Sequence, residues 1–347
     1  MEQRKIMALG KSSRVISLPK PWLKRNKLEQ GDRVSLYVQR DGSLVVHPSV
    51  DVKEDSKKIH LKIESNESED SIIRRIIGSY LDGYTLIKLT SESIFSVNQQ
   101  KAIRQIVGTL YMMIIESDAS RIILETLIDE SKVSVPSGIE RMHMITISMC
   151  RDILSSMKNW DEGLARSVVS LEDDVDQLMF LFLRLIRAAA ISPSLANQLD
   201  LDTLDCLDYQ TLVHRIERIA DLATSIANDV IALIDSKMSV PENVLTALIG
   251  ASEIAFTSYD TAVQSFLSKD VSLSNEIIDK QKEIDEIFIG ITPLPLFGEP
   301  DDISSLSHVT YIRENIRRIS HDAADIAELT IDRTYKTQRF PEPRAQT

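Results

Sequence analysis

Apolar residues recur every three to four positions through most of the chain's second half, which is the spacing of amphipathic helices. From about residue 136 onward this pattern predicts six helices, over Gly138–Met157, Glu162–Ala190, Asp205–Ser236, Glu242–Leu267, Ser274–Ile289 and Ile303–Thr334. Pro193 and Pro241 fall between these segments, where a residue without a backbone N–H interrupts no helix. The pattern favours a mainly α-helical protein.

The helical part contains an internal repeat. The segment from Val168 to Leu178 matches Ile277 to Ile287 at an offset of 109, and the segment from Ile216 to Ala227 matches Ile316 to Ala327 at an offset of 100. Offsets this similar are typical of a duplication whose loops have changed length. We therefore expect two tandem three-helix bundles, over residues 136–237 and 241–336.

The first 50 residues alternate with the shorter period of β-strands and form a separate expected domain. Strand patterns cover Lys5–Leu9, Val15–Leu18, Val34–Val38 and Leu44–Val46, and Pro21–Asn26 has the composition of a single helical turn. Asp41-Gly42 is a hairpin signal between the last two strands. We expect a small β domain here.

Residues 58–130 mix the two periods and predict a small α/β segment. Strand patterns lie at Ile59–Ile63 and Thr85–Leu89, helical patterns at Ser71–Leu81 and Gln99–Leu110, and a hairpin is expected across residues 112–127. No residue pattern in this segment indicates a chemistry. Its expected role is that of a linker or a dimer contact.

Charge is distributed unevenly over these parts. Residues 1–48 contain ten basic and four acidic side chains, a net charge of +6, whereas the remaining chain contains 30 basic and 48 acidic ones, a net charge of -18. A basic domain joined to an acidic body indicates two partners of different chemistry, and nucleic acid is the natural partner of the basic domain.

The composition favours a cytoplasmic protein without membrane insertion. The two cysteines, Cys150 and Cys206, form no metal-binding or CxxC spacing, as expected in a reducing compartment. The most apolar stretch, Leu178–Ile191, is interrupted by Arg184 and Arg187 and is too short to span a bilayer. No charged-then-apolar signal segment is found at the N-terminus.

Carboxylates at helical spacing are the strongest chemical signal. Glu172 and Asp176 lie four residues apart, as do Glu217 and Asp221, so each pair shares one helical face. Two such faces brought together would repel unless a cation or water compensated them, which leaves a metal site and a solvated acidic face as alternatives. The spacing does not distinguish iron, manganese, zinc, magnesium or calcium.

The corresponding positions of the second bundle differ. Gln281, Asp285, Arg317 and His321 stand where the first bundle has its four carboxylates. The second bundle is therefore expected to lack an equivalent site, although His321, Asp322 and Asp325 leave a different one open.

The residues around these carboxylates resemble the signatures of PhoU proteins. The run from Ile216 to Ala227 resembles the third-helix signature, and the run from Leu171 to Asp176 the second-helix signature. The resemblance covers about residues 138–334. It implies two tandem three-helix bundles, metal clusters held by (E/D)xxxD motifs at Glu172, Asp176, Glu217 and Asp221, and regulation of phosphate uptake in contact with a phosphate ABC transporter.

The N-terminal segment resembles the SpoVT/AbrB swapped-hairpin DNA-binding domain. Gly10-Lys11-Ser12, the run Val15–Pro19, Gly31-Asp32 and Asp41-Gly42 carry the resemblance. It implies an obligate homodimer in which each chain supplies half of an interlaced β-barrel. The residues expected to meet DNA are Lys5, Lys11, Arg14, Lys24 and Arg25. For each basic residue alone, a solubilising surface charge is the alternative, and family members also serve as antitoxins or as purely dimerising modules.

These observations lead to a functional expectation. The leading hypothesis is a homodimeric, phosphate-responsive transcriptional regulator that binds DNA through its N-terminal domain. A transporter-accessory protein whose N-terminal domain only dimerises is the alternative, and a carboxylate-bridged metalloenzyme is a third reading. No HExxH motif, catalytic triad pattern or phosphate-binding glycine loop is found, so we expect no enzyme.

Overall fold

The computed structural model describes residues 3–39, 42–48, 57–237, 240–290 and 303–335. The chain divides into two compact units, an N-terminal unit within residues 1–55 and a larger unit within residues 56–338. The expected domain limits at residues 50 and 336, and Asp41 of the expected hairpin, lie outside the described residues.

The N-terminal unit consists of two separate antiparallel strand pairs and one short helix. Strand β1 (Met7–Leu9) pairs with β2 (Ser13–Val15), helix α1 spans Lys20–Arg25, and β3 (Ser35–Val38) pairs with β4 (Leu44–His47). Gly10 adopts a φ of 69° in the β1–β2 turn, a conformation that glycine adopts without steric cost. The first, third and fourth expected strands and the helical turn are confirmed, whereas the second strand lies at Ser13–Val15 and not at the expected Val15–Leu18.

No described residue of the N-terminal unit is buried. Ile6, Leu9 and Val38 expose 73%, 63% and 70% of their surface. Two-stranded hairpins without a buried apolar face are marginally stable in water. The unit within one chain therefore lacks a core of its own.

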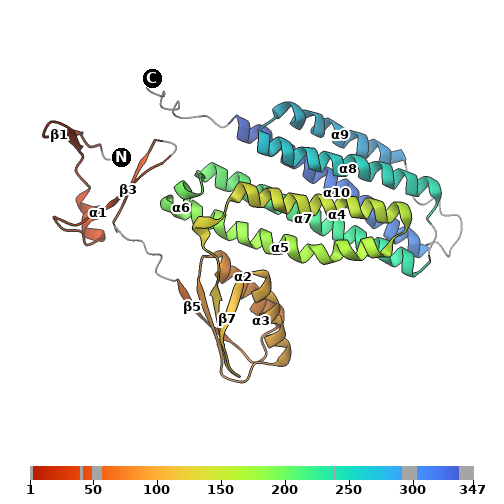
Figure 1. The fold of residues 1–347 in the computed structure, drawn as a ribbon, viewed down its shortest axis with the longest axis horizontal. Helices are drawn as coiled ribbons and strands as arrows, with labels where there is room; N and C mark the ends of the chain where they lie inside the picture. The colour runs from red at the N-terminus through yellow and green to blue at the C-terminus, as the bar shows by residue number, and fades with distance from the viewer. Residues whose placement is uncertain (1–2, 40–41, 49–56, 238–239, 291–302, 336–347) are drawn as a thin grey trace. The chain divides into compact units, whose positions relative to one another are not determined.

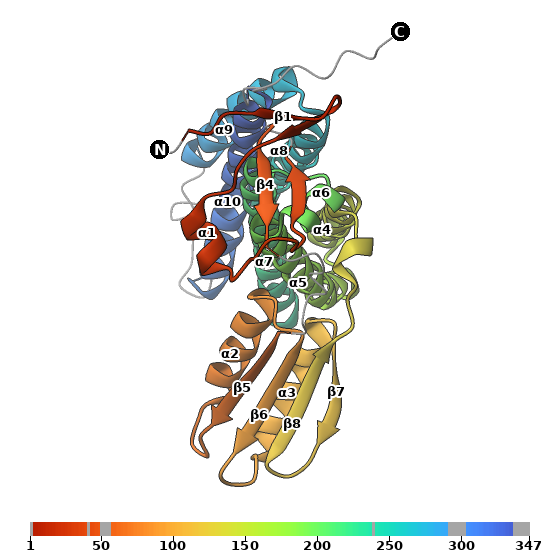
Figure 2. The ribbon, with the colours of Figure 1, turned by 90° about the vertical axis from the view of Figure 1, so that its left-hand side faces the viewer.

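The larger unit begins with the α/β segment. Its elements are β5 (Lys58–Ile63), α2 (Glu69–Leu81), β6 (Leu86–Ser91), α3 (Val97–Thr109), β7 (Met112–Ser117) and β8 (Arg121–Thr126). The strands form one sheet in the order β5-β6-β8-β7, with β5 and β6 parallel and the other neighbours antiparallel. Helices α2 and α3 lie on one face of this sheet (Figure 2).

Six long helices form the rest of the larger unit (Figure 1). They are α4 (Val135–Asn159), α5 (Glu162–Ile191), α7 (Thr203–Asp235), α8 (Glu242–Ser268), α9 (Val271–Gly290) and α10 (Ile303–Thr334). Each begins and ends within three residues of its predicted limits, so the mainly α-helical fold with two three-helix bundles is confirmed. The short helix α6 (Pro193–Gln198) and the 3₁₀ turn Glu130–Lys132 were not predicted.

The two bundles share one apolar core. Helix α4 packs against α8, and α7 packs against α10, and buried residues from both bundles belong to a single continuous cluster. No described helix is long and apolar enough to cross a membrane.

The α/β segment is attached to the bundles through arginine side chains of α5. Arg184 is 1% exposed and forms an ion pair of 2.7 Å with Glu130. It also donates hydrogen bonds to the carbonyl oxygens of Tyr80 (2.5 Å) and Tyr84 (3.0 Å). Arg187 donates to the Leu81 carbonyl and pairs with Asp82 at 2.7 Å. The last turn of α2 and the residues after it are thereby joined to α5.

Replacing Arg184 by methionine should destabilise the larger unit by about 3–5 kcal/mol, because Glu130 and two buried carbonyl oxygens lose their partner. Arg187→Met is the matched control: its exposed ion pair should be worth about 1 kcal/mol or less. Urea unfolding followed by circular dichroism measures both. Equal losses in the two variants would contradict the structural role assigned to Arg184.

Candidate metal centre and nucleic-acid interface

Packing between α5 and α7 positions the carboxylates that the sequence singled out. Val175 and Leu178 on α5, and Ile216, Ile219 and Ala220 on α7, are buried in the core between the helices. Asp176, Glu217 and Asp221 are neighbours of these residues in sequence, at the margin of the buried faces. Burial of the apolar residues therefore draws the carboxylates of the two helices together.

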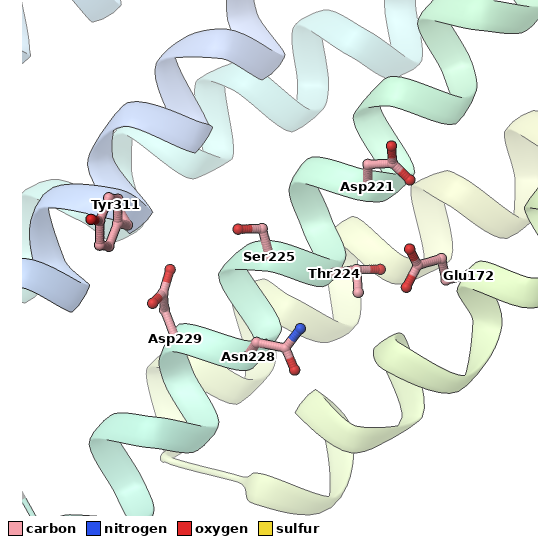
Figure 3. A pocket seen from close by; sticks show the side chains of 7 residues that line it. All are labelled: Glu172, Asp221, Thr224, Ser225, Asn228, Asp229 and Tyr311. Atoms are coloured by element: carbon pink, nitrogen blue, oxygen red, sulfur yellow. The ribbon is translucent and has the colours of Figure 1, made fainter. Parts of the chain in front are cut away.

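Three of the four expected ligands meet. Asp176, Glu217 and Asp221 each place one carboxylate oxygen within 4.8 Å of the others. Asp176 and Glu217 are half-buried, and Asp221 is exposed. Glu172 borders this trio without belonging to it. Figure 3 shows the side chains of Glu172 and Asp221 pointing toward each other from α5 and α7.

The four carboxyl groups all bind protons more tightly than they do in water. Burial, together with the charges of Asp221 and Glu172, raises the pKa of Asp176 to about 6. The pKa of Glu217 is raised by burial and then by the charges of Asp221 and Asp176. Burial also raises the pKa values of Glu172 and Asp221. The direction is the one expected of like charges crowded in a partly dry site.

No side-chain cation compensates the trio. Among the residues that the structure describes, no lysine or arginine lies within 4.0 Å of a carboxylate oxygen of Asp176, Glu217 or Asp221. Oxygen ligands that carry negative charge and face one point suit a hard cation or an iron or manganese ion. The donor set therefore fits a metal ion, which would supply the missing positive charge.

The equivalent place in the second bundle is filled differently. Arg317 lies 4.0 Å and His321 lies 3.6 Å from the carboxylate of Asp285. Asp322 and Asp325 form ion pairs with Arg215, at 2.5 and 2.8 Å. Among the described residues, the trio on α5 and α7 is the one metal-like cluster.

A groove of about 490 Å³ extends from the carboxylates along α7. Its wall is polar and is formed by Glu172, Asp221, Thr224, Ser225, Asn228, Asp229 and Tyr311 (Figure 3). The carboxylate of Asp229, one of these residues, lies 2.8 Å from the ring of His308. Glu172 and Asp221 were expected site residues, whereas sequence reasoning missed the other five. Ser225 and Asn228 follow Asp221 at helical spacing, so extending the acidic face of this helix by two turns would have found them.

The five basic residues expected to meet DNA are all exposed. Lys11 lies in the β1–β2 turn, Arg14 in β2, and Lys24 and Arg25 at the end of α1, whereas Lys5 precedes β1. Within the described part of the chain, none of the five forms an ion pair with an acidic side chain. Their charges are thus available to an external anion.

Comparison with known proteins covers both units. The model of the PhoU domain matches residues 139–230 and 248–330, which together make up half of the chain. The model described as "Antidote-toxin recognition MazE, bacterial antitoxin" matches residues 8–55.

Individual relatives match the larger unit. A protein of Rhizobium meliloti named "Phosphate-specific transport system accessory protein PhoU homolog" is 23% identical over 58% of this chain and 84% of its own length. A Caulobacter vibrioides protein of the same name is 22% identical over 58% of this chain and 86% of its own length. The crystal structure of PhoU from Pseudomonas aeruginosa superposes with a TM-score of 0.51 at 21% identity, covering 57% of this chain and 93% of that one.

Neutralising one carboxylate of the trio should stabilise the metal-free protein. Asp176→Asn keeps the shape of the side chain and removes a repelled, half-buried charge. The melting temperature in the presence of a chelator should therefore rise, by roughly 2–4 °C for each kcal/mol of repulsion relieved. Differential scanning calorimetry measures the change.

Asp174→Asn serves as the control, because Asp174 is exposed on the same helix and lies outside the trio. It should leave the melting temperature within about one degree, as expected of a surface substitution. A lower melting temperature for Asp176→Asn would mean that the carboxylate makes net favourable contacts, and the account of the trio as a repulsive cluster would be wrong.

Proposed function

The chain belongs to the PhoU family, and from this premise we propose that it is a homodimeric regulator of phosphate uptake that binds DNA through its N-terminal unit. The helical unit senses phosphate status, and the N-terminal unit acts on an operator. Acting on DNA requires a cytoplasmic location. Regulation by binding, and no catalysis, is the proposed activity.

The observation that carries this proposal is the uncompensated positive charge of the N-terminal unit. A net charge of +6 is concentrated in 48 residues of a chain whose remainder carries -18, and the five basic side chains named above are exposed. A polyanion with evenly spaced phosphates is the partner that such a surface attracts most strongly. The match to the MazE antitoxin model over residues 8–55 supports this assignment.

Dimerisation follows from the exposed apolar residues of the same unit. Ile6, Leu9 and Val38 project from two hairpins that bury no described residue. A second copy of the unit can cover these side chains by adding its own strands, as the expected interlaced barrel requires. Two copies also double the number of basic residues that face one DNA duplex.

A metal ion is the proposed cofactor of the helical unit. Asp176, Glu217 and Asp221 would hold it, with Glu172 at the border of the site. The ion would supply positive charge that removes the repulsion between α5 and α7. Metal occupancy would thereby alter the packing of these two helices.

Helix α5 offers a physical route from the carboxylates to the N-terminal part of the chain. Asp176 is followed directly by Gln177, whose side-chain amide donates a 2.9 Å hydrogen bond to the Gly108 carbonyl at the end of α3. Arg184 and Arg187, two to three turns later, bind the end of α2. A shift of α5 would therefore move the α/β segment, whose strand β5 follows the N-terminal unit in sequence.

The PhoU homologues named above are accessory proteins of phosphate-specific transport systems. A component of a phosphate ABC transporter is accordingly the proposed protein partner of the helical unit. If the N-terminal unit only dimerises, the protein acts through this partner alone, which is the alternative function. DNA binding separates the two.

The affinity of the full-length protein for DNA should fall steeply with added salt, because each neutralised phosphate contributes a slope of about -0.9 in a plot of log affinity against log salt. Lys11→Ala/Arg14→Ala should weaken binding at least about 10-fold and make the slope shallower. An electrophoretic mobility shift with DNA from upstream of phosphate-uptake genes, at 50 and 200 mM salt, measures both.

Arg74→Ala/Lys101→Ala is the matched control, since it removes two exposed cations from α2 and α3 of the α/β segment. It should leave DNA affinity unchanged. Absence of a shift for the unaltered protein at either salt concentration, with a dimeric mass in solution, would favour the transporter-accessory function. An equal loss in both double variants would indicate binding by general charge and not by the N-terminal unit.

A further inference from the structure

The sheet of the α/β segment has one covered and one uncovered face. Ile59, Leu61 and Ile63 of β5, and Ile87 and Leu89 of β6, point toward α2 and α3 and belong to or pack against the core of the segment. The alternate residues form the opposite face. Within the described part of the larger unit, no helix lies against that opposite face (Figure 2).

The uncovered face is divided into two halves that differ in charge. Its β5–β6 half carries the cations Lys58, Lys62 and Lys88. Its β8–β7 half carries Glu125 and the ion pair of Arg121 with Glu116, together with the exposed Met113 and Ile115 (42% and 45% exposed). Leu86 on β6 and Ile123 on β8 are only partly buried. The cross-strand register aligns Lys58, Leu86, Glu125 and Met113 in one row.

Some charges of this face are paired within the chain, Lys62 with Glu92 and Arg121 with Glu116, but three of the described charges are not. Among the described residues, neither Lys58 nor Lys88 forms an ion pair, and Glu125 does not either. The unpaired cations lie on the β5–β6 half, and the unpaired acid and the exposed apolar side chains lie on the β8–β7 half, so the face is complementary to a second copy of itself. Two copies related by a two-fold axis parallel to the strands would lay each basic half over the other copy's acidic half.

We propose that this uncovered sheet face, formed by the outward residues of β5, β6, β8 and β7, is an interface with the same face of a second copy of the chain. This inference rests on the homodimer of the proposed function and adds a second contact to it. The sheets pack face to face, about 10 Å apart. Leu86, Ile123, Met113 and Ile115 lose contact with water there.

Other ways of covering the segment fit less well. Joining of sheet edges is disfavoured because Lys58 and Lys62 stand on the β5 edge and a bulge at Ile115 interrupts the β7 edge. Single-stranded nucleic acid would require aromatic side chains for base stacking, and the four strands contain no Phe, Tyr or Trp. The N-terminal unit is basic like the β5–β6 half, so the two repel.

The uncovered sheet face is small, so its contact with a second copy is weak by itself. Four strands of about six residues cover about 20 Å by 20 Å, less than a stable dimer interface needs by itself. Only the ten residues 48–57 separate β4 from β5, and they span at most about 40 Å. Dimerisation of the N-terminal units would therefore hold the two faces at millimolar effective concentration, where a weak contact forms.

Distances between spin labels in the full-length protein test the interface. Both native cysteines are buried, so a cysteine introduced at exposed Lys62, on the rim of the face, can be labelled selectively. Double electron–electron resonance should give one narrow inter-copy distance below about 30 Å, given the strand and sheet spacings. A label at Lys101, on α3 behind the sheet, should give a longer distance.

Charge-reversal variants provide a second test of the interface. Lys58→Glu/Lys88→Glu should broaden and lengthen the distance between the labels at position 62, because both basic halves then face Glu125 of the other copy. Adding Glu125→Lys should restore the narrow distance, since the halves are complementary again. Arg74→Glu/Lys101→Glu makes the same change of charge on the helical side and should leave the distance at position 62 unaltered.

The molecular mass in solution separates this inference from the proposed function. A dimeric mass with a broad distance at position 62 in the otherwise unaltered protein would overturn the sheet interface and leave the dimeric regulator standing. A monomeric mass would overturn both. Failure of Glu125→Lys to restore the distance would also overturn the interface, because self-complementarity of charge is its basis.

Discussion

Burial of the apolar faces of α5 and α7 against each other is the constraint from which the candidate site arises. Val175, Leu178, Ile216 and Ile219 are all buried in this contact, and each fully buried aliphatic side chain contributes about 1.5–3 kcal/mol. That gain holds Asp176, Glu217 and Asp221 within 4.8 Å despite their mutual repulsion. A cluster maintained against its own electrostatics is ready to accept a cation, because its ligands are gathered before the ion arrives.

The corresponding positions of the second bundle carry different side chains. Arg317 and His321 stand at the positions of Glu217 and Asp221 and both approach Asp285. Arg317 there supplies a positive charge of the kind that the trio lacks among the described residues. Other buried charges of the helical unit are likewise paired: Asp322, only 2% exposed, contacts Arg215 and Arg218, and Arg333 lies against the rings of Tyr209 and Phe266. The trio on α5 and α7 departs from this rule among the described residues.

The two units differ in how much of their apolar surface is buried within a single chain. The helical unit joins both bundles in one core, whereas the N-terminal unit leaves Ile6, Leu9 and Val38 exposed within a single chain. The α/β segment lies between these extremes, since it has a core of its own and one uncovered face. Incomplete burial in the two N-terminal parts, next to a complete core in the helical part, is consistent with assembly of two chains through their N-terminal parts.

The sequence alone determined the features that depend on local periodicity and on charge. Six helices were predicted to within three residues at each end because their apolar residues repeat with the helical period over 16 or more positions. Helix α6 and the 3₁₀ turn at Glu130 were not predicted, because they are too short to show a helical repeat of apolar residues. The basic N-terminal part, the duplicated bundles and the four carboxylates at i,i+4 spacing were also evident.

Only the tertiary structure decided which distant residues meet. Glu172 shares a helical face with Asp176, yet the register between α5 and α7 leaves it at the border of the trio. In the sequence, Arg184 is only a charged residue within an apolar stretch. In the structure the α/β segment packs on α5, and Arg184 is buried there in contact with Glu130 and the end of α2. The uncovered sheet face depends on strand order and on the side that α2 and α3 occupy. Such contacts follow from how helices and strands pack across long sequence separations, which no local pattern encodes.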